Sequence, residues 1–295
     1  MKTIIAGSLL LLFFSCSQSK DEKCYDYNLV YLSKASGNYD IYLNDLKGNE
    51  QQLTTNPSWD WYPMWNQLLE SIIHYAYIND TFQIRRVSLD GSILELDTKE
   101  LLEFNLSPNA SMVVMEENKG DNRQLVIVSL DKMNRVPITD STSYNGRAKW
   151  SPDSKKIAYI SGRDGNNEVY LYDLKSKKTK RLTKDSLTQK YLTWSPDNRS
   201  IAYTNEYYGE DEDDRNDVFI LNLESGISTQ ITKNEFEDSE LDWSPDGKKI
   251  AFHSKRNGYD HIYTMNIDGS DVQQISTQDA YHGEPVWVKK EINCQ

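Results

Sequence analysis

The sequence has little helical periodicity, little positive charge and little cysteine. After residue 25 helical patterning is nearly absent, whereas Tyr, Ile, Val and Thr, the residues that strands prefer, are abundant. The chain carries 33 Lys and Arg against 45 Asp and Glu, a net charge of −12, which argues against binding nucleic acid or docking electrostatically to anionic lipid. Three cysteines among 295 residues exclude a disulfide-dense scaffold. An acidic all-β chain is indicated.

Several catalytic and metal-binding motifs are also absent. The chain has no G-x-S-x-G and no room for a hydrolase domain, so serine-peptidase activity is not expected. Its four histidines show no H-E-x-x-H spacing, and only His282 is predicted to lie in a loop, so no metal or other cofactor is expected. The acidic stretch 209–217 lacks the spacing of a calcium loop and is interpreted as a solvated insertion.

A repeat of about 40 residues organises the chain. Its clearest copy, residues 241–275, contains strand-like runs near Asp242–Trp243, Lys249–Ser254, His261–Asn266 and Val272–Ile275, joined by turn sequences such as Ser244-Pro245-Asp246-Gly247. Four antiparallel strands of this size cannot bury their own faces, so copies must stack. The anchor position of each copy is held by Trp65, Leu106, Trp150, Trp194, Trp243 and Trp287, with steps of 41, 44, 44, 49 and 44 residues.

The two ends of the chain together form one repeat. Leu29 and Ile41 have the twelve-residue step of a second and third strand but no anchor before them, and Trp287 is an anchor with nothing after it. The strand around Trp287 is therefore predicted to pair with the N-terminal repeat. The predicted fold is a ring of six four-stranded antiparallel blades over residues 24–295, a β-propeller without a long free edge.

The W-S-P-D sequences at Trp150, Trp194 and Trp243, each followed by I-A-[YF], resemble the WD40-like propeller repeat of the TolB type. The same repeat occurs in dipeptidyl-peptidase-like and tricorn-like enzymes. The resemblance covers nearly the whole mature chain and is strongest in the last three repeats. It implies six blades, in agreement with the count, and leaves the function open because this fold hosts both binding and catalysis.

The first residues resemble a secretion signal. Lys2 precedes the apolar run 4–14, which is too short to span a membrane, and Ser15-Cys16 follows. Phe13-Phe14-Ser15-Cys16 resembles a bacterial lipobox, which implies a signal peptide over 1–15, a lipidated Cys16 and a tether over 16–23. The alternative is an ordinary signal peptide. Lipid anchoring to the outer membrane of a bacterial envelope is expected.

The two remaining cysteines flank the predicted closure. Cys24 lies five residues before Leu29, and Cys294 lies seven after Trp287, so both map to the turn that joins strands one and two in other blades. A Cys24–Cys294 disulfide would replace that missing turn in an oxidising compartment, and two unpaired thiols are the alternative.

Candidate binding residues are those that differ between repeats, because residues shared by all blades maintain the fold. Trp150, Trp194 and Trp243 are expected to pack between blades, and Asp153, Asp197 and Asp246 to form turns. The loops leading into each first strand, which ring the central channel, vary and combine aromatic with charged residues. The predicted ligand-binding residues are Trp59, Asp60, Trp61, Tyr62, Tyr144, Arg147, Lys190, Tyr191, Glu240, Tyr281, His282 and Glu284.

The expected function is non-enzymatic binding. A monomeric envelope lipoprotein that holds a protein or peptide partner at these loops fits the pattern best. The alternative is carbohydrate binding or oligosaccharide lysis at the same loops, which an open pocket containing Trp59, Trp61, Tyr62 and Tyr281 would favour. Aromatic packing that plugs the channel is the structural alternative to both.

Overall fold

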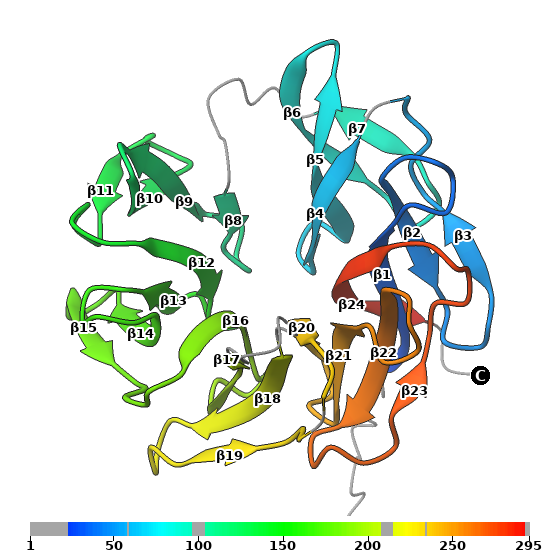
Figure 1. Ribbon diagram of the computed structural model, residues 1–295. Helices are drawn as coiled ribbons and strands as arrows, with labels where there is room; N and C mark the ends of the chain where they lie inside the picture. Colours follow the sequence, from blue (N-terminus) through cyan, green and yellow to red (C-terminus); the bar gives the residue numbers. More distant parts are fainter. Residues whose placement is uncertain (1–22, 58, 96–103, 208–214, 234, 293–295) are drawn as a thin grey trace, which may run out of the picture.

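The computed structural model describes residues 23–57, 59–95, 104–207, 215–233 and 235–292. They form six sheets of four antiparallel strands, arranged around a central channel as the blades of a propeller (Figure 1). The predicted fold class is confirmed. Within the described ranges no helix is long and apolar enough to cross a membrane.

Each blade has one strand next to the channel and three further out. The innermost strands are β24 (His282–Ile292), β4 (Asp60–Asn66), β8 (Phe104–Leu106), β12 (Asn145–Trp150), β16 (Thr188–Trp194) and β20 (Asp238–Trp243). The second strands are β1 (Cys24–Ser33), β5 (Ser71–Ile78), β9 (Met112–Lys119), β13 (Lys156–Ser161), β17 (Ser200–Tyr207) and β21 (Lys249–Ser254). The third strands are β2 (Asp40–Asn44), β6 (Thr81–Val87), β10 (Asn122–Ser129), β14 (Glu168–Asp173), β18 (Arg215–Asn222) and β22 (His261–Asn266). The outer strands are β3 (Glu50–Gln52), β7 (Ile93–Glu95), β11 (Arg135–Pro137), β15 (Lys178–Arg181), β19 (Ser228–Gln230) and β23 (Gln273–Gln274).

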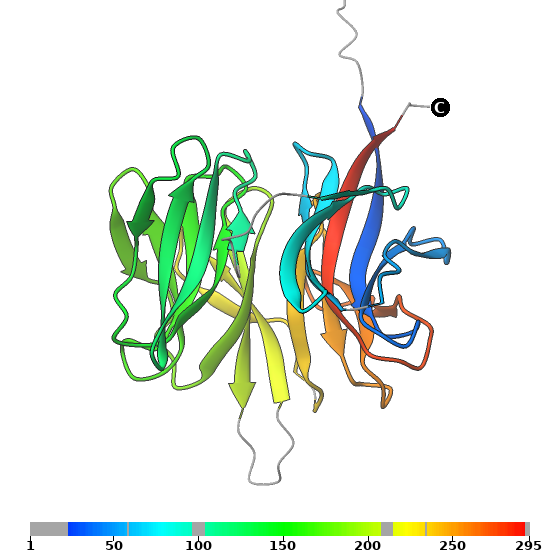
Figure 2. The same cartoon turned by 90° about the horizontal axis from the view of Figure 1, so that it is seen from above.

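The first blade joins the two ends of the described chain. In its sheet β24 lies beside β1, with Leu29 opposite Trp287 and Cys24 opposite Ile292. The two strands run side by side and leave the ring on the same face (Figure 2). The predicted closure is confirmed. Cys294, the predicted partner of Cys24, lies outside the described residues, as do the signal segment and Cys16.

The S-P-D turns are built around a serine hydroxyl. Ser151 donates to Asp153 at 2.7 Å, and its oxygen accepts from the backbone N–H of Lys156 at 2.9 Å. The same Ser–Asp bond recurs in the fifth and sixth blades, at 2.6 and 2.7 Å. These hydrogen bonds stabilise the turn between strands one and two. The repeated aspartates therefore have a structural role, as predicted.

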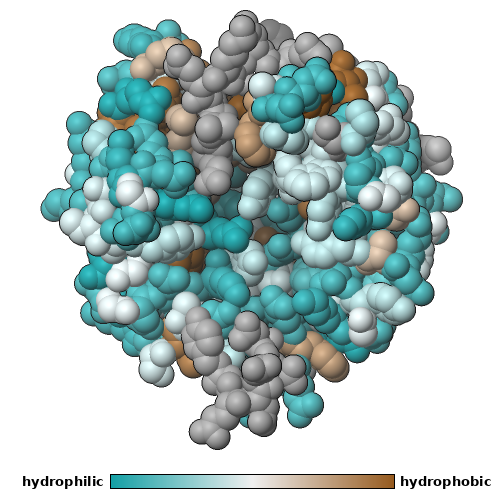
Figure 3. Space-filling view, turned by 45° about the horizontal axis from the view of Figure 1, so that its top comes forward, coloured by the Kyte–Doolittle hydropathy of each residue, from teal (hydrophilic) through white to brown (hydrophobic). Residues whose placement is uncertain are grey.

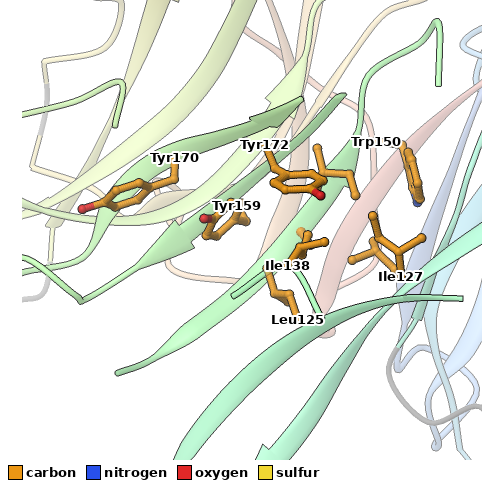
Figure 4. Close-up of a cluster of buried hydrophobic side chains, with 10 residues drawn as sticks. Leu125, Ile127, Ile138, Trp150, Tyr159, Tyr170 and Tyr172 are labelled. Carbon is orange, nitrogen blue, oxygen red and sulfur yellow. The ribbon is translucent and has the colours of Figure 1, made fainter. Parts of the chain in front are cut away.

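Apolar contacts between neighbouring blades form the core. Trp150 packs against Leu125, Ile127 and Ile138 of the third blade and the tyrosines of its own blade (Figure 4). Its indole Nε1 donates to the backbone oxygen of Asn105 at 2.9 Å, and that of Trp194 donates to Lys149 at 3.1 Å. Trp150 and Trp194 therefore tie their blades to the ones before them, as the repeat predicts.

Candidate binding site in the central channel

The innermost strands are interrupted near their beginnings. In five blades the pairing of strands one and two shifts register, leaving two residues of the inner strand bulged toward the channel. Tyr62, Arg147, Glu240 and Glu284 occupy the same bulge position, three residues before the anchor, with φ of 49°, 55°, 52° and 52°. The backbone of residues other than glycine rarely adopts this left-handed conformation, so contacts with the surrounding protein must stabilise it.

A cavity of about 280 Å³ lies at these bulges, inside the ring. Residues of all six innermost strands line it, including the bulge residues Tyr62, Arg147, Tyr191, Glu240 and Glu284. The centre of the face seen in Figure 1 is hollowed and surrounded mainly by hydrophilic residues (Figure 3). A concave site with a few convergent polar groups is typical of ligand binding.

Carboxylates hold the bulges in place across the blade boundaries. Glu240 Oε2 accepts from the backbone N–H of Glu284 at 2.7 Å, and Glu284 Oε2 accepts from that of Tyr62 at 2.6 Å. In the fourth blade Glu116 Oε1, from β9 of the third blade, accepts from the N–H of Arg147 at 2.7 Å. Each acid therefore fixes the backbone of the next blade, which pre-organises the cavity wall.

Glu284 has an unusual protonation state. Burial, together with the nearby Glu240 charge, raises the pKa of its carboxyl to about 8, and the hydrogen bond from the Tyr62 N–H opposes this rise. At neutral pH the carboxyl of Glu284 therefore stays largely protonated. Perturbed acids of this kind cluster at functional sites.

The opposite side of the cavity is basic. The guanidinium of Arg147 lies over the Tyr191 ring, 4.8 Å from its centroid. The side chain of Lys149 is open to the channel and has no ion pair or hydrogen bond with another described residue. Although the side chain reaches the channel, the surrounding protein of the ring desolvates its ammonium and lowers the pKa of Lys149, and the carboxylate of Asp242 opposes that effect.

Asp242 joins three blades at the channel. Its carboxylate accepts from the backbone N–H of Trp287 at 2.7 Å and from the Thr193 hydroxyl at 3.1 Å. Burial raises the pKa of Asp242 to about 6, with these hydrogen bonds and Lys149 acting in the other direction. Asp242 therefore links neighbouring blades and also places a negative charge near Lys149 in the channel.

Two glycines make room for tyrosines at the cavity wall. A Cβ on Gly146 would lie 2.6 Å from the Tyr144 hydroxyl, and one on Gly283 would lie 2.6 Å from a carboxylate oxygen of Glu240. A Cβ on Gly283 would also collide with the Tyr281 hydroxyl. The Y-x-G sequence in the fourth and first blades therefore reflects a tyrosine folded over its own strand.

The structure brings together half of the predicted binding residues. Those that line the cavity are Tyr62, Tyr144, Arg147, Tyr191, Glu240 and Glu284. Trp59 and Trp61 lie outside it in an aromatic row, their ring centroids 5.3 Å apart. Tyr281 packs edge-on against Tyr39, and Lys190 pairs with Glu206 at 2.6 Å.

Two predicted residues lie in buried contacts away from the cavity. Asp60 is fully buried, with an oxygen 3.2 Å from Nδ1 of the core histidine His74. The prediction of His282 in a loop is wrong, because it begins β24, stacks on His261 and has Nε2 2.8 Å from the Gln278 carbonyl.

Sequence reasoning missed cavity residues outside the loops. Glu116 and Arg123 come from β9 and β10 of the third blade and pair at 2.7 Å. Lys149 and Asp242 each lie one residue before an anchor, where other blades have Met64, Asn105, Thr193 or Val286. A comparison of that position across the blades would have found both charges.

Among the described residues, no group of three or more His, Cys, Asp and Glu is placed to hold a metal ion. Three of the histidines are committed to contacts within or between blades: His253 lies 2.7 Å from Asp260, His261 3.1 Å from the Ser276 hydroxyl, and His74 beside Asp60. The donor set of the cavity, three acids beside three bases and four tyrosine hydroxyls, does not fit a metal centre.

Fold and cavity together define a six-bladed β-propeller with a polar cavity in its channel. The model of the TolB beta propeller domain matches residues 134–293, more than half of the chain, and the chain belongs to this family. A comparison with curated protein sequences gave no significant match.

Solved structures with the same fold are distant in sequence. TolB from Acinetobacter baumannii is 20% identical with a TM-score of 0.72, over 88% of this chain and 66% of that one, just under two thirds of its length. A putative TolB from Agrobacterium tumefaciens is 17% identical with a TM-score of 0.68, over 92% and 100%. An oligogalacturonate lyase in complex with manganese is 14% identical with a TM-score of 0.57, over 85% and 74%. These likenesses establish the shared fold.

Proposed function

We propose that this protein is a non-enzymatic lipoprotein of the bacterial envelope that binds a protein or peptide partner in its central cavity. The observation that carries the proposal is the set of bulges, which place tyrosines and charged groups in one pre-organised cavity. Tyrosine offers a rigid apolar ring with a hydrogen-bonding hydroxyl, and side chains of this kind dominate the binding energy of protein interfaces.

The orientation of the strands supports the envelope arrangement. β24 begins at His282, on the cavity side, and ends at Ile292, opposite Cys24. A tether from Cys16 would therefore leave the ring on the face opposite the beginnings of the innermost strands, and the cavity would open away from the membrane. Metabolic labelling with a fatty-acid analogue tests the anchor: label must appear on the protein and be lost in Cys16→Ala.

Photo-crosslinking in the envelope tests partner binding. A photoreactive amino acid at Tyr62, which is 46% exposed at the cavity, should give a discrete protein or peptide adduct. The same group at Ile227, 64% exposed at the outer edge of the fifth blade, is the matched control and should give none. No adduct at Tyr62, or the same adducts at both positions, contradicts the proposal.

The second candidate is binding or lysis of oligosaccharides, and the aromatic row beside the cavity favours it. Trp59 is 51% exposed and Phe82 56% exposed, with Trp61 between them at 5.3 and 6.1 Å between ring centroids. A lyase with the same fold acts on oligogalacturonate, as its name states. A rise in melting temperature with trigalacturonate that Trp59→Ala abolishes would favour this candidate over a peptide partner.

A further inference from the structure

The charges of the cavity are divided between two walls. The basic wall is formed by Arg147 and Lys149 of β12, and the acidic wall by Glu240 of β20 and Glu284 of β24. In the ring of six blades, β12 lies across the channel from β24, with β20 beside β24 (Figure 1). The remaining charged lining residues, Glu116 and Arg123, pair with each other. The cavity is therefore dipolar.

The acidic wall has free acceptor capacity. Oε2 of Glu240 and Oε2 of Glu284 each accept a backbone N–H, while their Oε1 atoms have no hydrogen bond to another described residue. These two carboxyls come from adjacent blades and face the same space. A ligand ammonium placed there would take the place of the proton that Glu284 holds at neutral pH, so that the carboxylates of both Glu240 and Glu284 could accept its N–H groups.

The basic wall has free donor capacity. Lys149 makes no ion pair with a described residue, although it lies among the charges of Asp242, Glu284 and Glu116. Arg147 is fixed above Tyr191, so its guanidinium is held in one orientation toward the cavity. A carboxylate between Lys149 and Arg147 would be bound by two cations within the ring, where charge pairing is stronger than on the outer surface.

We propose, on the basis of the proposed function, that the cavity recognises both free ends of a short peptide, its ammonium at the Glu240–Glu284 wall and its carboxylate at the Lys149–Arg147 wall. A lone anion would face the acidic wall and a lone cation the basic wall, whereas a dipolar ligand satisfies both. The volume of about 280 Å³ equals that of about nine water molecules at ~30 Å³ each, which suits a peptide of a few small residues.

Titration calorimetry with oligoalanines of two to five residues tests this proposal on the purified full chain. Alanine side chains carry no recognition group, so binding reports on the two ends. We expect one length to bind best, and its N-acetylated and its C-amidated forms each to bind at least about tenfold more weakly, because each loses a charged hydrogen-bonding partner.

Variants assign each end to its wall. Lys149→Met should weaken the free peptide about tenfold and bind the free and C-amidated forms equally, while still preferring a free N-terminus. Glu284→Gln should bind the free and N-acetylated forms equally, while it still prefers a free carboxylate over the C-amidated form. Lys180→Met and Glu224→Gln, at exposed positions on the outer part of the fourth and fifth blades, are the matched controls and should bind as the wild type does.

The outcomes separate this proposal from the broader one. If capped and free oligoalanines bind equally, or if none binds while crosslinking at Tyr62 still yields a partner, end recognition is overturned and partner binding stands. If neither the oligoalanines nor the crosslinker finds a ligand, both proposals fail. If Lys149→Met stops distinguishing free from N-acetylated peptides, or Glu284→Gln stops distinguishing free from C-amidated peptides, the assignment of the two ends to the two walls is overturned.

Discussion

The innermost strands contribute to two regions of the molecule that follow opposite rules. At the anchor positions nearly every blade has Trp, buried against the preceding blade. Three residues and one residue before the anchor, side chains face the channel, and there the blades carry Tyr, Arg, Glu, Lys, Asp or Met. The residues that recur in the blades therefore form the interfaces between blades, whereas the residues that differ from blade to blade line the channel. The predictions below separate the two regions.

The largest effect is expected at the interface. Trp150→Ala removes a large buried side chain and the hydrogen bond to Asn105, and should lower the free energy of unfolding by about 3–5 kcal/mol. Urea unfolding followed by circular dichroism measures it. Trp65→Ala is the control, because Trp65 is only half-buried and its Nε1 donates to Gln67 of its own blade. Equal losses for the two variants would contradict the role given to the interface.

An intermediate effect is expected where the two regions meet. Asp242→Ala removes the acceptor of the Trp287 N–H and of the Thr193 hydroxyl, and should lower the free energy of unfolding by about 1–3 kcal/mol. Asp242→Asn keeps an acceptor oxygen and should cost less. If Asp242→Ala unfolds at the same urea concentration as the wild type, Asp242 does not join the blades.

The smallest effect, and one that depends on pH, is expected within the channel. Since the pKa of Glu284 is raised from 4.5 to about 8 on folding, the folded state holds a proton that the unfolded state has lost between these values. The contribution of Glu284 to stability is therefore complete below pH 4.5 and is lost as the pH rises toward 8.

Glu284→Gln removes this dependence. Relative to the wild type, its free energy of unfolding should increase from pH 7 to pH 9 by an amount on the order of 1 kcal/mol. Chemical unfolding at several pH values measures it, with Glu224→Gln at an exposed site as the control. A constant difference between Glu284→Gln and the wild type across this range would show that the carboxyl does not titrate as described.

Most of the fold was predictable from the sequence because it is repeated. Anchor spacing gave the number of blades, and the unmatched Trp287 and Leu29 gave the closure that pairs β24 with β1. The strands Lys249–Ser254 and His261–Asn266 were predicted with their observed bounds. Each of these features depends on local pattern and apolar spacing, which a single sequence contains.

The site was predictable only in part, because bulges are tertiary features. His282 was predicted to lie in a loop before the closing strand, yet it is buried at the start of β24, and the bulge that follows it places Glu284 at the cavity. Lys149 and Asp242 were overlooked because they sit next to the anchor, in positions interpreted as plain strand. Glu116 lines the cavity from β9, the second strand of its blade, where the repeat pattern indicated only a structural strand.

The pairing of β1 with β24 also has a consequence for chain connectivity. Since Cys24 lies opposite Ile292 and both strands leave on one face, a short linker would join them without crossing the channel (Figure 2). New ends opened in the Ser195–Asn198 turn would then make the first blade continuous and divide the fifth between the two ends. The sequence order of the blades is thus one of several equivalent circular permutations of the same ring.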